Sequence, residues 1–336
     1  MFKLIKTLTR VGAVAALLLT VQPVVAQRCV APEACCGPCA DWCDMCGDWE
    51  IGAHALFWTP VTCAYDYVVN SPAATPTAPF IGTVSALKCS TDWGFRVFGN
   101  YLLDCSFIGL GYQWFKSKTA DSRTGADLRI KGGGAVNSGR VAARQTIEYQ
   151  NVDLRWGQYL HRTCGCNFYL FGNARWVDLS YRRSIRQQVL NTDQIRLVTE
   201  KSSLQGGALG VGTGAEFDLW CGIGLFGEAN VLGVIAERST RNINFIDPNP
   251  AQSVSARYPS DTCINPELDF RIGLNYSYTC GCWTFVGEIG YEVDYFWDAV
   301  AFPTNTATQL VGPSDWVVVC QNVGFSGLFF GGRVLF

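Results

Sequence analysis

Histidine and methionine are scarce in this chain, with two residues of each among 336. Neither His54 nor His161 belongs to a catalytic or metal-binding motif, and the chain has no Gly-x-Ser-x-Gly elbow and no Walker loop. General acid–base, nucleophilic and phosphate-binding chemistry all need side-chain sets that are not visible here. We therefore expect no enzyme activity, no cofactor and no bound metal.

Long apolar runs are also missing once the first segment of the chain is set aside. A membrane-spanning helix needs roughly 18 or more consecutive apolar residues, and no later stretch supplies them without charges. Strong positive charge is absent as well, because the formal net charge is -2. These absences argue against a helical membrane protein and against a nucleic-acid partner.

The first 26 residues form an expected export signal. Lys3, Lys6 and Arg10 precede a short apolar run over residues 11–21, and small residues end at Ala26. This arrangement is typical of a cleaved signal peptide, residues 1–26. Export predicts an oxidising compartment for the 16 cysteines.

Glycine (35 residues) and aromatic residues (13%) are plentiful, and strand after strand alternates with a period of two. Over residues 268–278 the even positions are apolar or aromatic, and the odd positions carry Asp269 and Arg271. Over 283–297 the odd positions are apolar or glycine, with aromatics at both ends of the segment. Alternate side chains of a strand point to opposite faces, so one face is apolar and the other charged. A soluble barrel would carry its charge outside; apolar faces ending in aromatics are typical of outer-membrane strands.

The same pattern predicts an all-β fold, a transmembrane antiparallel β-barrel of about ten strands, with 12 or more left open, over residues 48–336. The expected strands are Asp48–Pro60, Thr91–Leu103, Cys105–Lys116, Tyr149–His161, Asn167–Tyr181, Gln205–Leu219, Gly222–Ala236, Glu267–Tyr278, Trp283–Trp297 and Asn322–Phe336. Short turns separate some of them, and long polar loops are expected at Thr62–Ser90, Ser117–Glu148, Arg182–Leu204, Glu237–Pro266 and Asp298–Gln321. This alternation predicts short periplasmic turns, long extracellular loops and both chain ends in the periplasm.

Two details of the strand pattern give sharper expectations. After Trp176 the alternation slips at Asp178, which indicates either a β-bulge or the point where the strand leaves the lipid. The last segment is apolar on the face that contains Leu328, Phe330 and Phe336, while Arg333 points the other way. We expect this strand to close the barrel against the first one, with Phe336 as a barrel-assembly signal.

The cysteines avoid the strands and gather in connections. Six lie in a cysteine-rich segment expected to be periplasmic, residues 27–47, and six lie at the expected periplasmic turns; the other four lie at the roots of long loops. All are disulfide candidates: Cys29, Cys35, Cys36, Cys39, Cys43, Cys46, Cys63, Cys89, Cys105, Cys164, Cys166, Cys221, Cys263, Cys280, Cys282 and Cys320. They either pair within the chain or link it to cysteine-rich envelope proteins, and spacing does not decide between these. The spacing between Cys36 and Cys46 matches neither a zinc ribbon nor a ferredoxin run.

The hairpins resemble those of a known family. Asp92-Trp93-Gly94-Phe95, Gly99-Asn100-Tyr101 and Leu110-Gly111-Tyr112 with Trp114 look like the repeated hairpin of Legionella-type major outer membrane proteins, which have relatives in chlamydia-like bacteria. Asp48 to Gly52 and the terminal Phe336 fit the same pattern. The resemblance implies an abundant porin of the bacterial outer membrane, held partly by disulfides. The block between Cys29 and Cys46 departs from the Legionella-type pattern and is closer to the cysteine-linked chlamydial envelope.

The charged faces of the strands supply the candidate site. The predicted pore-lining residues are Glu50, Arg96, Arg155, Arg175, Glu228, Asp269, Arg271, Glu288, Glu292, Asp294 and Arg333. We therefore expect a porin-like protein for passive diffusion of small hydrophilic solutes, mildly favouring cations, with a disulfide-linked structural role in the envelope. Arginine–carboxylate pairs across a barrel this narrow would instead fill it, which favours a non-conducting structural or adhesive barrel. Outer-membrane lipid and lipopolysaccharide are the expected partners, and a homo-oligomer is left open.

Overall fold

The computed structural model describes residues 48–62, 66–70, 83–103, 105–130, 138–162, 165–189, 194–247, 254–280, 282–305 and 316–336. The predicted signal peptide, the cysteine-rich segment at 27–47, and Cys63 and Cys164 therefore lie outside the described residues. Within the described residues no helix is long and apolar enough to span a bilayer.

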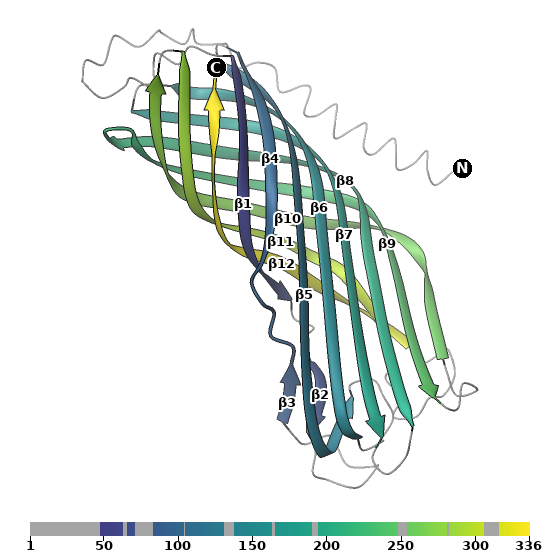
Figure 1. Cartoon of the computed structure of the whole chain (residues 1–336). Helices are drawn as coiled ribbons and strands as arrows, with labels where there is room; N and C mark the ends of the chain where they lie inside the picture. Colours follow the sequence, from purple (N-terminus) through teal and green to yellow (C-terminus); the bar gives the residue numbers. More distant parts are fainter. Residues whose placement is uncertain are drawn as a thin grey trace, which may run out of the picture.

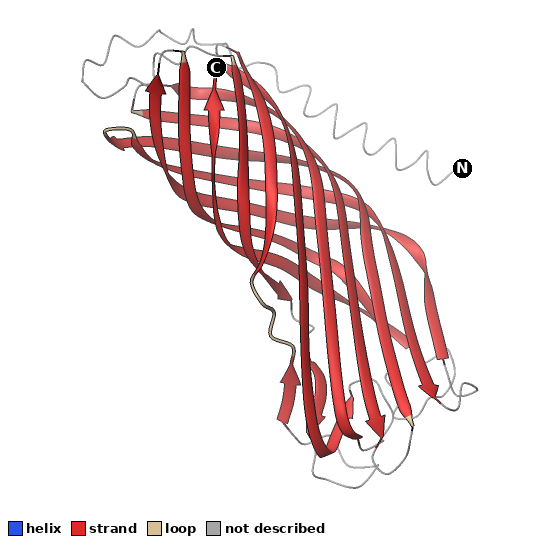
Figure 2. Cartoon of the chain, viewed as in Figure 1, coloured by secondary structure: helices blue, strands red, loops and turns tan. Residues whose placement is uncertain are grey.

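Almost every described residue belongs to a strand (Figure 2). The strands are β1 (Trp49–Thr62), β2 (Asp66–Asn70), β3 (Thr83–Ala86), β4 (Asp92–Leu103), β5 (Ser106–Ile130), β6 (Ser138–Arg162), β7 (Cys166–Val189), β8 (Ile195–Trp220), β9 (Ile223–Asp247), β10 (Val254–Cys280), β11 (Trp283–Asn305) and β12 (Trp316–Leu335). They form one antiparallel sheet in the order β3-β2-β5-β4-β1-β12-β11-β10-β9-β8-β7-β6, and an additional β5–β6 pairing closes it into a ring. Ten strands make the ring, as the sequence predicts, and β2 and β3 extend the edge of β5 beyond it.

The terminal strand closes the barrel. The C-terminal part of β12 pairs with β1 along the length of β1, from Glu50 opposite Leu335 to Thr62 opposite Val323. At the end of this ladder Trp49 and Phe336 exchange backbone hydrogen bonds of 3.1 and 3.0 Å. The Phe336 ring stacks on Trp283 of β11, with centroids 5.0 Å apart. The expectation that the last strand seals against the first is confirmed.

The two ends of the barrel differ (Figure 1). The short connections β4–β5, β6–β7, β8–β9 and β10–β11 lie at the end where β12 finishes, which we call the short-turn end. At the other, long-loop end, β5 to β9 run on well past the rest of the barrel. The barrel is therefore lopsided, with a tall wall of β5 to β9 facing the shorter β1, β4, β11 and β12.

This wall corrects the sequence-based loop assignment. Most of the residues predicted as loops at 117–148, 182–204 and 237–266 continue the strands, as do parts of the predicted loop at 298–321. The predicted strands end where the apolar outer face stops. Hydrogen-bond ladders do not need lipid, however, and a strand that has left the bilayer is polar outside without ending. The bounds of the strands were wrong here, although their number and order were right.

The break in the alternation at Asp178 was expected to mark either a β-bulge or the point where the strand leaves the lipid, and the structure favours the second. The ladders between β6 and β7 and between β7 and β8 run through Asp178 without a register shift, so there is no bulge. Asp178 stays on the outer face and accepts a 3.0 Å hydrogen bond from Gln150 Nε2 on β6. A polar pair on the outside marks the level at which β6 and β7 rise out of the apolar band.

Candidate functional site in the barrel interior

Every residue predicted to line a pore faces the interior. Among the described residues the buried charged side chains include Glu50, Asp153, Arg175, Glu228, Glu288, Glu292 and Asp294. The outer face is correspondingly apolar, with exposed side chains such as Ile51, Trp156, Leu170, Val231 and Phe330. The alternation in the sequence therefore gives the direction of each side chain correctly, whereas a conducting path is a separate question.

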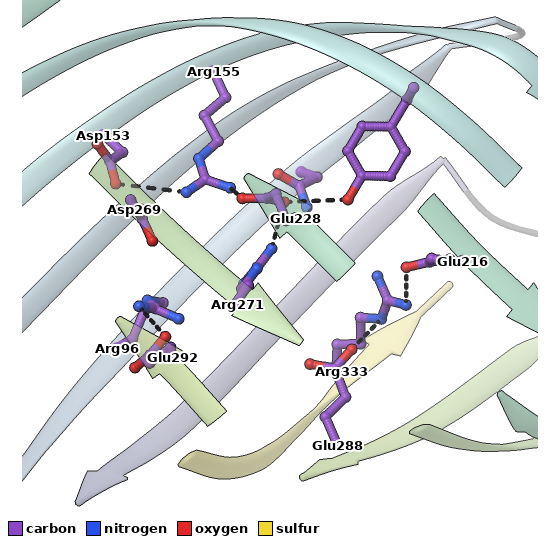
Figure 3. Close-up of polar contacts among 12 residues, drawn as sticks. Arg96, Asp153, Arg155, Glu216, Glu228, Asp269, Arg271, Glu288, Glu292 and Arg333 are labelled. Atoms are coloured by element: carbon purple, nitrogen blue, oxygen red, sulfur yellow. Dashed lines mark hydrogen bonds and ion pairs between the residues drawn. The ribbon is translucent and has the colours of Figure 1, made fainter. Parts of the chain in front are cut away.

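The charges nearest the short-turn end are joined in bridges that span several strands (Figure 3). Arg333 on β12 contacts Glu50 on β1 at 3.1 Å and Glu216 on β8 at 2.8 Å. Its Nε lies 3.1 Å from Glu288 on β11, and the other Glu288 oxygen lies 2.7 Å from His54 Nε2. One guanidinium thus links strands that are separated by three others on the ring.

A second bridge is centred on a carboxylate. Glu228 on β9 accepts from Arg155 on β6 at 2.8 Å and from Arg271 on β10 at 2.7 Å. The Tyr169 hydroxyl donates to the same carboxylate at 3.2 Å. Figure 3 shows Arg155 lying between Asp153 and Glu228, so this network also crosses the interior.

A third group surrounds Arg175 on β7. Its guanidinium contacts Asp153 at 2.5 and 3.1 Å, Asp269 at 3.0 Å, and Glu267 of the same strand as Asp269. The side chain is 2% exposed, so four charged groups share a nearly dry environment. Arg96 on β4 similarly reaches Glu292 on β11 at 2.8 Å, and Trp58 Nε1 donates to the other Glu292 oxygen at 2.8 Å.

Toward the long-loop end the interior becomes apolar, which the sequence analysis missed. Leu56, Trp58, Phe115, Tyr149, Phe325 and Phe329 are fully buried members of one cluster with residues from β7, β8, β9 and β11. Tyr149 on β6 meets Phe296 on β11 with ring centroids 5.4 Å apart. Four strands separate β6 from β11 on either side of the ring, so this contact joins opposite walls. The signal was present in the sequence, because Leu56 and Trp58 continue the inward phase of Glu50 and His54.

The end of the β11–β12 hairpin helps to fill the same region. Between Phe296 and Val300 the register with β12 shifts, and Asp298 has a positive φ of 52°. Beyond this bulge Ala299, Val300, Ala301 and Phe302 are almost completely buried. Ala301 N donates to Ser202 Oγ on β8 at 3.1 Å, and the Phe302 ring packs edge-on against Tyr181 on β7 at 4.9 Å. We call the buried residues 299–302 the inner segment of β11.

A cavity of about 80 Å³ remains among the charged groups. It is lined from the short-turn end by Glu50, Tyr159 and Glu216 and extends to Gln113 and Asn151. The fully buried Trp58, Tyr149 and Phe296 are not among its lining residues. The cavity is therefore a chamber in the polar part of the interior.

Most of the described cysteines lie in connections or at strand ends, but Cys263 and Cys320 lie inside β10 and β12, so the expectation that the cysteines avoid the strands is wrong for these two. Cys105, Cys166, Cys221, Cys280 and Cys282 are at the short-turn end, and Cys89, Cys263 and Cys320 are toward the long-loop end. Cys263, Cys280, Cys282 and Cys320 are thiols in this structure. Links to other proteins are untested by these positions, so the disulfide assignment stays a prediction. Among the described residues no group of three or more His, Cys, Asp or Glu could hold a metal ion.

Comparison with known sequences identifies the family. The profile described as Legionella pneumophila major outer membrane protein precursor matches residues 43–336, nearly the whole chain. The chain belongs to this family of major outer membrane proteins. The barrel is therefore an outer-membrane barrel, and the predicted location in the outer membrane is confirmed. No curated protein matches this chain.

Solved structures with a similar fold are distant in sequence. The outer membrane protease OmpT from Escherichia coli is 11% identical, with a TM-score of 0.48, over 85% of this chain and 96% of that one. A Pseudomonas aeruginosa FadL homologue is 6% identical, with a TM-score of 0.26, over 85% and 89%. The Ralstonia pickettii toluene transporter TbuX is 10% identical, with a TM-score of 0.24, over 86% and 89%. Likeness at this level carries no inference about what this family member does.

Proposed function

We propose that this protein is a structural outer-membrane barrel that is closed to passive diffusion in the conformation described. The observation that carries the proposal is the contact between Tyr149 and Phe296 on opposite walls, within a cluster of fully buried side chains. A ten-stranded barrel is narrow enough for side chains to fill it. Here arginine–carboxylate bridges fill part of the polar half, and aromatic packing fills the apolar half.

A liposome swelling assay tests closure. Purified, folded protein is inserted into liposomes, and swelling is followed in solutions of a small sugar and of an amino acid. We expect proteoliposomes to swell no faster than protein-free liposomes, whatever the protein density. A swelling rate that rises with protein density, in proteoliposomes whose barrels resist proteolysis, would overturn the proposal.

A second candidate, passive diffusion of small hydrophilic solutes, is supported by a specific feature. The chamber near the short-turn end is polar, and the inner segment of β11 is attached to the rest of the strand through the bulge at residues 297–299. Movement of the hairpin end together with the aromatic side chains would join this chamber to the long-loop end. A shortened hairpin, with residues 299–320 replaced by a two-residue turn, should then make liposomes permeable. If this variant stays as tight as the wild type, the second candidate is wrong.

The structural role includes covalent links at the short-turn end. Cys280 and Cys282 are exposed there, at the same end of the barrel as the start of β1. Exposed thiols in an oxidising compartment form disulfides readily. Non-reducing electrophoresis of outer membranes should show high-mass species that collapse to the monomer on reduction. The double variant Cys280→Ser/Cys282→Ser should form fewer of these high-mass species, whereas Cys263→Ser should form as many as the wild type. A wild-type protein that is entirely monomeric without reduction would contradict the proposal.

A further inference from the structure

Three inward-facing polar side chains line one side of the chamber, each with one atom that no other described residue engages. Arg96 on β4, Gln113 on β5 and Asn151 on β6 face inward at the same level, because Arg96 pairs opposite Gln113 and Gln113 opposite Asn151. All three line the cavity. The atoms left without a partner are Arg96 Nη1, Gln113 Nε2 and Asn151 Oδ1. Gln113 and Asn151 are 4% and 1% exposed, so bulk water does not satisfy them.

Neighbouring groups fix which atom of each side chain is unengaged. Arg96 uses Nε and Nη2 on Gln113 Oε1, at 2.8 and 2.6 Å, and Nη2 also on Glu292. A guanidinium only donates, so the Gln113 oxygen must face it and the Gln113 amide nitrogen must face the chamber. Asn151 Nδ2 donates to the Tyr149 hydroxyl at 2.6 Å, which leaves the Asn151 oxygen as an acceptor. The row therefore offers two donors and then one acceptor.

From this row we infer a binding site for a small α-amino or α-hydroxy carboxylate. The ligand carboxylate accepts from Arg96 Nη1 and Gln113 Nε2, and the adjacent ammonium or hydroxyl donates to Asn151 Oδ1. Charge-assisted bonds from a guanidinium to a carboxylate are the strong ones, and buried polar groups without partners cost about 1–3 kcal/mol each. Binding to this row would engage three such atoms together.

The size of the chamber fits this class of ligand. A water molecule needs about 10–15 Å³ of such volume, so the cavity of about 80 Å³ holds roughly five to eight water-sized groups. Glycine, alanine, glycolate and lactate have five or six non-hydrogen atoms, whereas a disaccharide is far too large. The inference is independent of solute passage, because a chamber closed toward the long-loop end can bind a ligand from the short-turn end.

Equilibrium dialysis with radiolabelled L-alanine tests the site in folded, full-length protein held in detergent micelles. L-Alanine and L-lactate should bind at one site per barrel. Propionate, which lacks the donor for Asn151, should bind at least about tenfold more weakly, since a buried acceptor is left unpaired. Absence of saturable alanine binding, or equal affinity for alanine and propionate, would overturn the inference.

Variants locate the site and separate it from folding. Gln113→Leu removes one donor and should weaken alanine binding by at least about tenfold. Asn151→Leu should instead lower the preference for alanine over propionate toward unity while propionate affinity is kept. Gln205→Leu, a matched change on the exposed outer face of β8, should bind like the wild type. If Gln113→Leu fails to fold, Gln113→Glu places a carboxylate beside the ligand and should abolish binding; wild-type affinity in either folded Gln113 variant would contradict the assignment. Swelling assays are not involved, so failure here leaves the closed-barrel proposal standing.

Discussion

Arg175 provides the sharpest test of how the interior is held together. Replacing it with methionine keeps much of the side-chain volume and removes the guanidinium that contacts Asp153, Glu267 and Asp269 together. The side chains of Asp153, Glu267 and Asp269 are 10%, 0% and 12% exposed, so water replaces the lost guanidinium poorly. Removing one partner of a buried ion pair costs about 3–5 kcal/mol, and we expect Arg175→Met to lower the free energy of unfolding by that amount.

The assay is urea unfolding of the folded barrel in detergent, followed by tryptophan fluorescence. With a denaturant dependence of about 1–3 kcal/mol per molar urea, the midpoint should fall by at least about 1 M. Arg123→Met is the matched control, because the Arg123 side chain is 57% exposed and lies 3.6 Å from Asp121. An exposed pair of this kind contributes about 0–1 kcal/mol.

A second substitution separates lost charge pairing from lost packing. In the Arg175→Met background, Glu267→Gln removes one of the uncompensated carboxylates and should recover part of the lost stability. If Arg175→Met costs no more than Arg123→Met, or if Glu267→Gln makes the double variant less stable still, the buried-bridge reasoning is wrong.

Three further predictions concern the strand ends, the bulge and the cysteines. Phe336→Ser removes the ring that stacks on Trp283, so the amount of the protein in the outer membrane should fall. The control Phe245→Ser, at the long-loop end of β9, should leave that amount unchanged. Equal amounts of the two variants would count against the role of the terminal residue. Asp298 has a left-handed backbone conformation. In urea unfolding, Asp298→Val should therefore lower the free energy of unfolding by about 1–2 kcal/mol, whereas Asp298→Gly should not lower it. Similar losses for both variants would argue against this backbone geometry. Thiol reduction should dissociate envelope assemblies without reducing the β-sheet circular dichroism signal, because backbone hydrogen-bond ladders close the barrel into a ring; a collapsed signal would show that disulfides hold the barrel itself.

The sequence predicted the barrel because its physical signal is local. Alternation along each strand indicates which side chains face lipid and which face inward. It predicted the inward direction of Glu50, Arg175 and Arg333 from each strand's own sequence, without information on the neighbouring strands. The pairing of those groups is not local. Arg333 on β12 reaches Glu216 on β8 only because the sheet closes into a ring. Three strands separate β12 from β8 along the ring, and their side chains meet across the interior.

Two features of the interior were missed for different reasons. Trp58, Phe115 and Tyr149 lie on the same inward-facing positions as the charges, and those positions were expected to be polar along each strand. Following them to the end of each strand would have revealed the apolar half. The inner segment of β11 had no comparable signal, because its position depends on a bulge at residues 297–299 and on contacts with β7 and β8.

Single-channel recording tests the closed interior most directly. Folded protein with its native cysteines unreduced is inserted into planar bilayers under a salt gradient, and current is followed as the voltage is stepped. We expect no channel current at any voltage, because Tyr149 and Phe296 on opposite walls are in contact. Discrete conductance steps from demonstrably folded barrels would contradict this expectation, and a reversal potential showing cation preference would point to the acidic lining as the path.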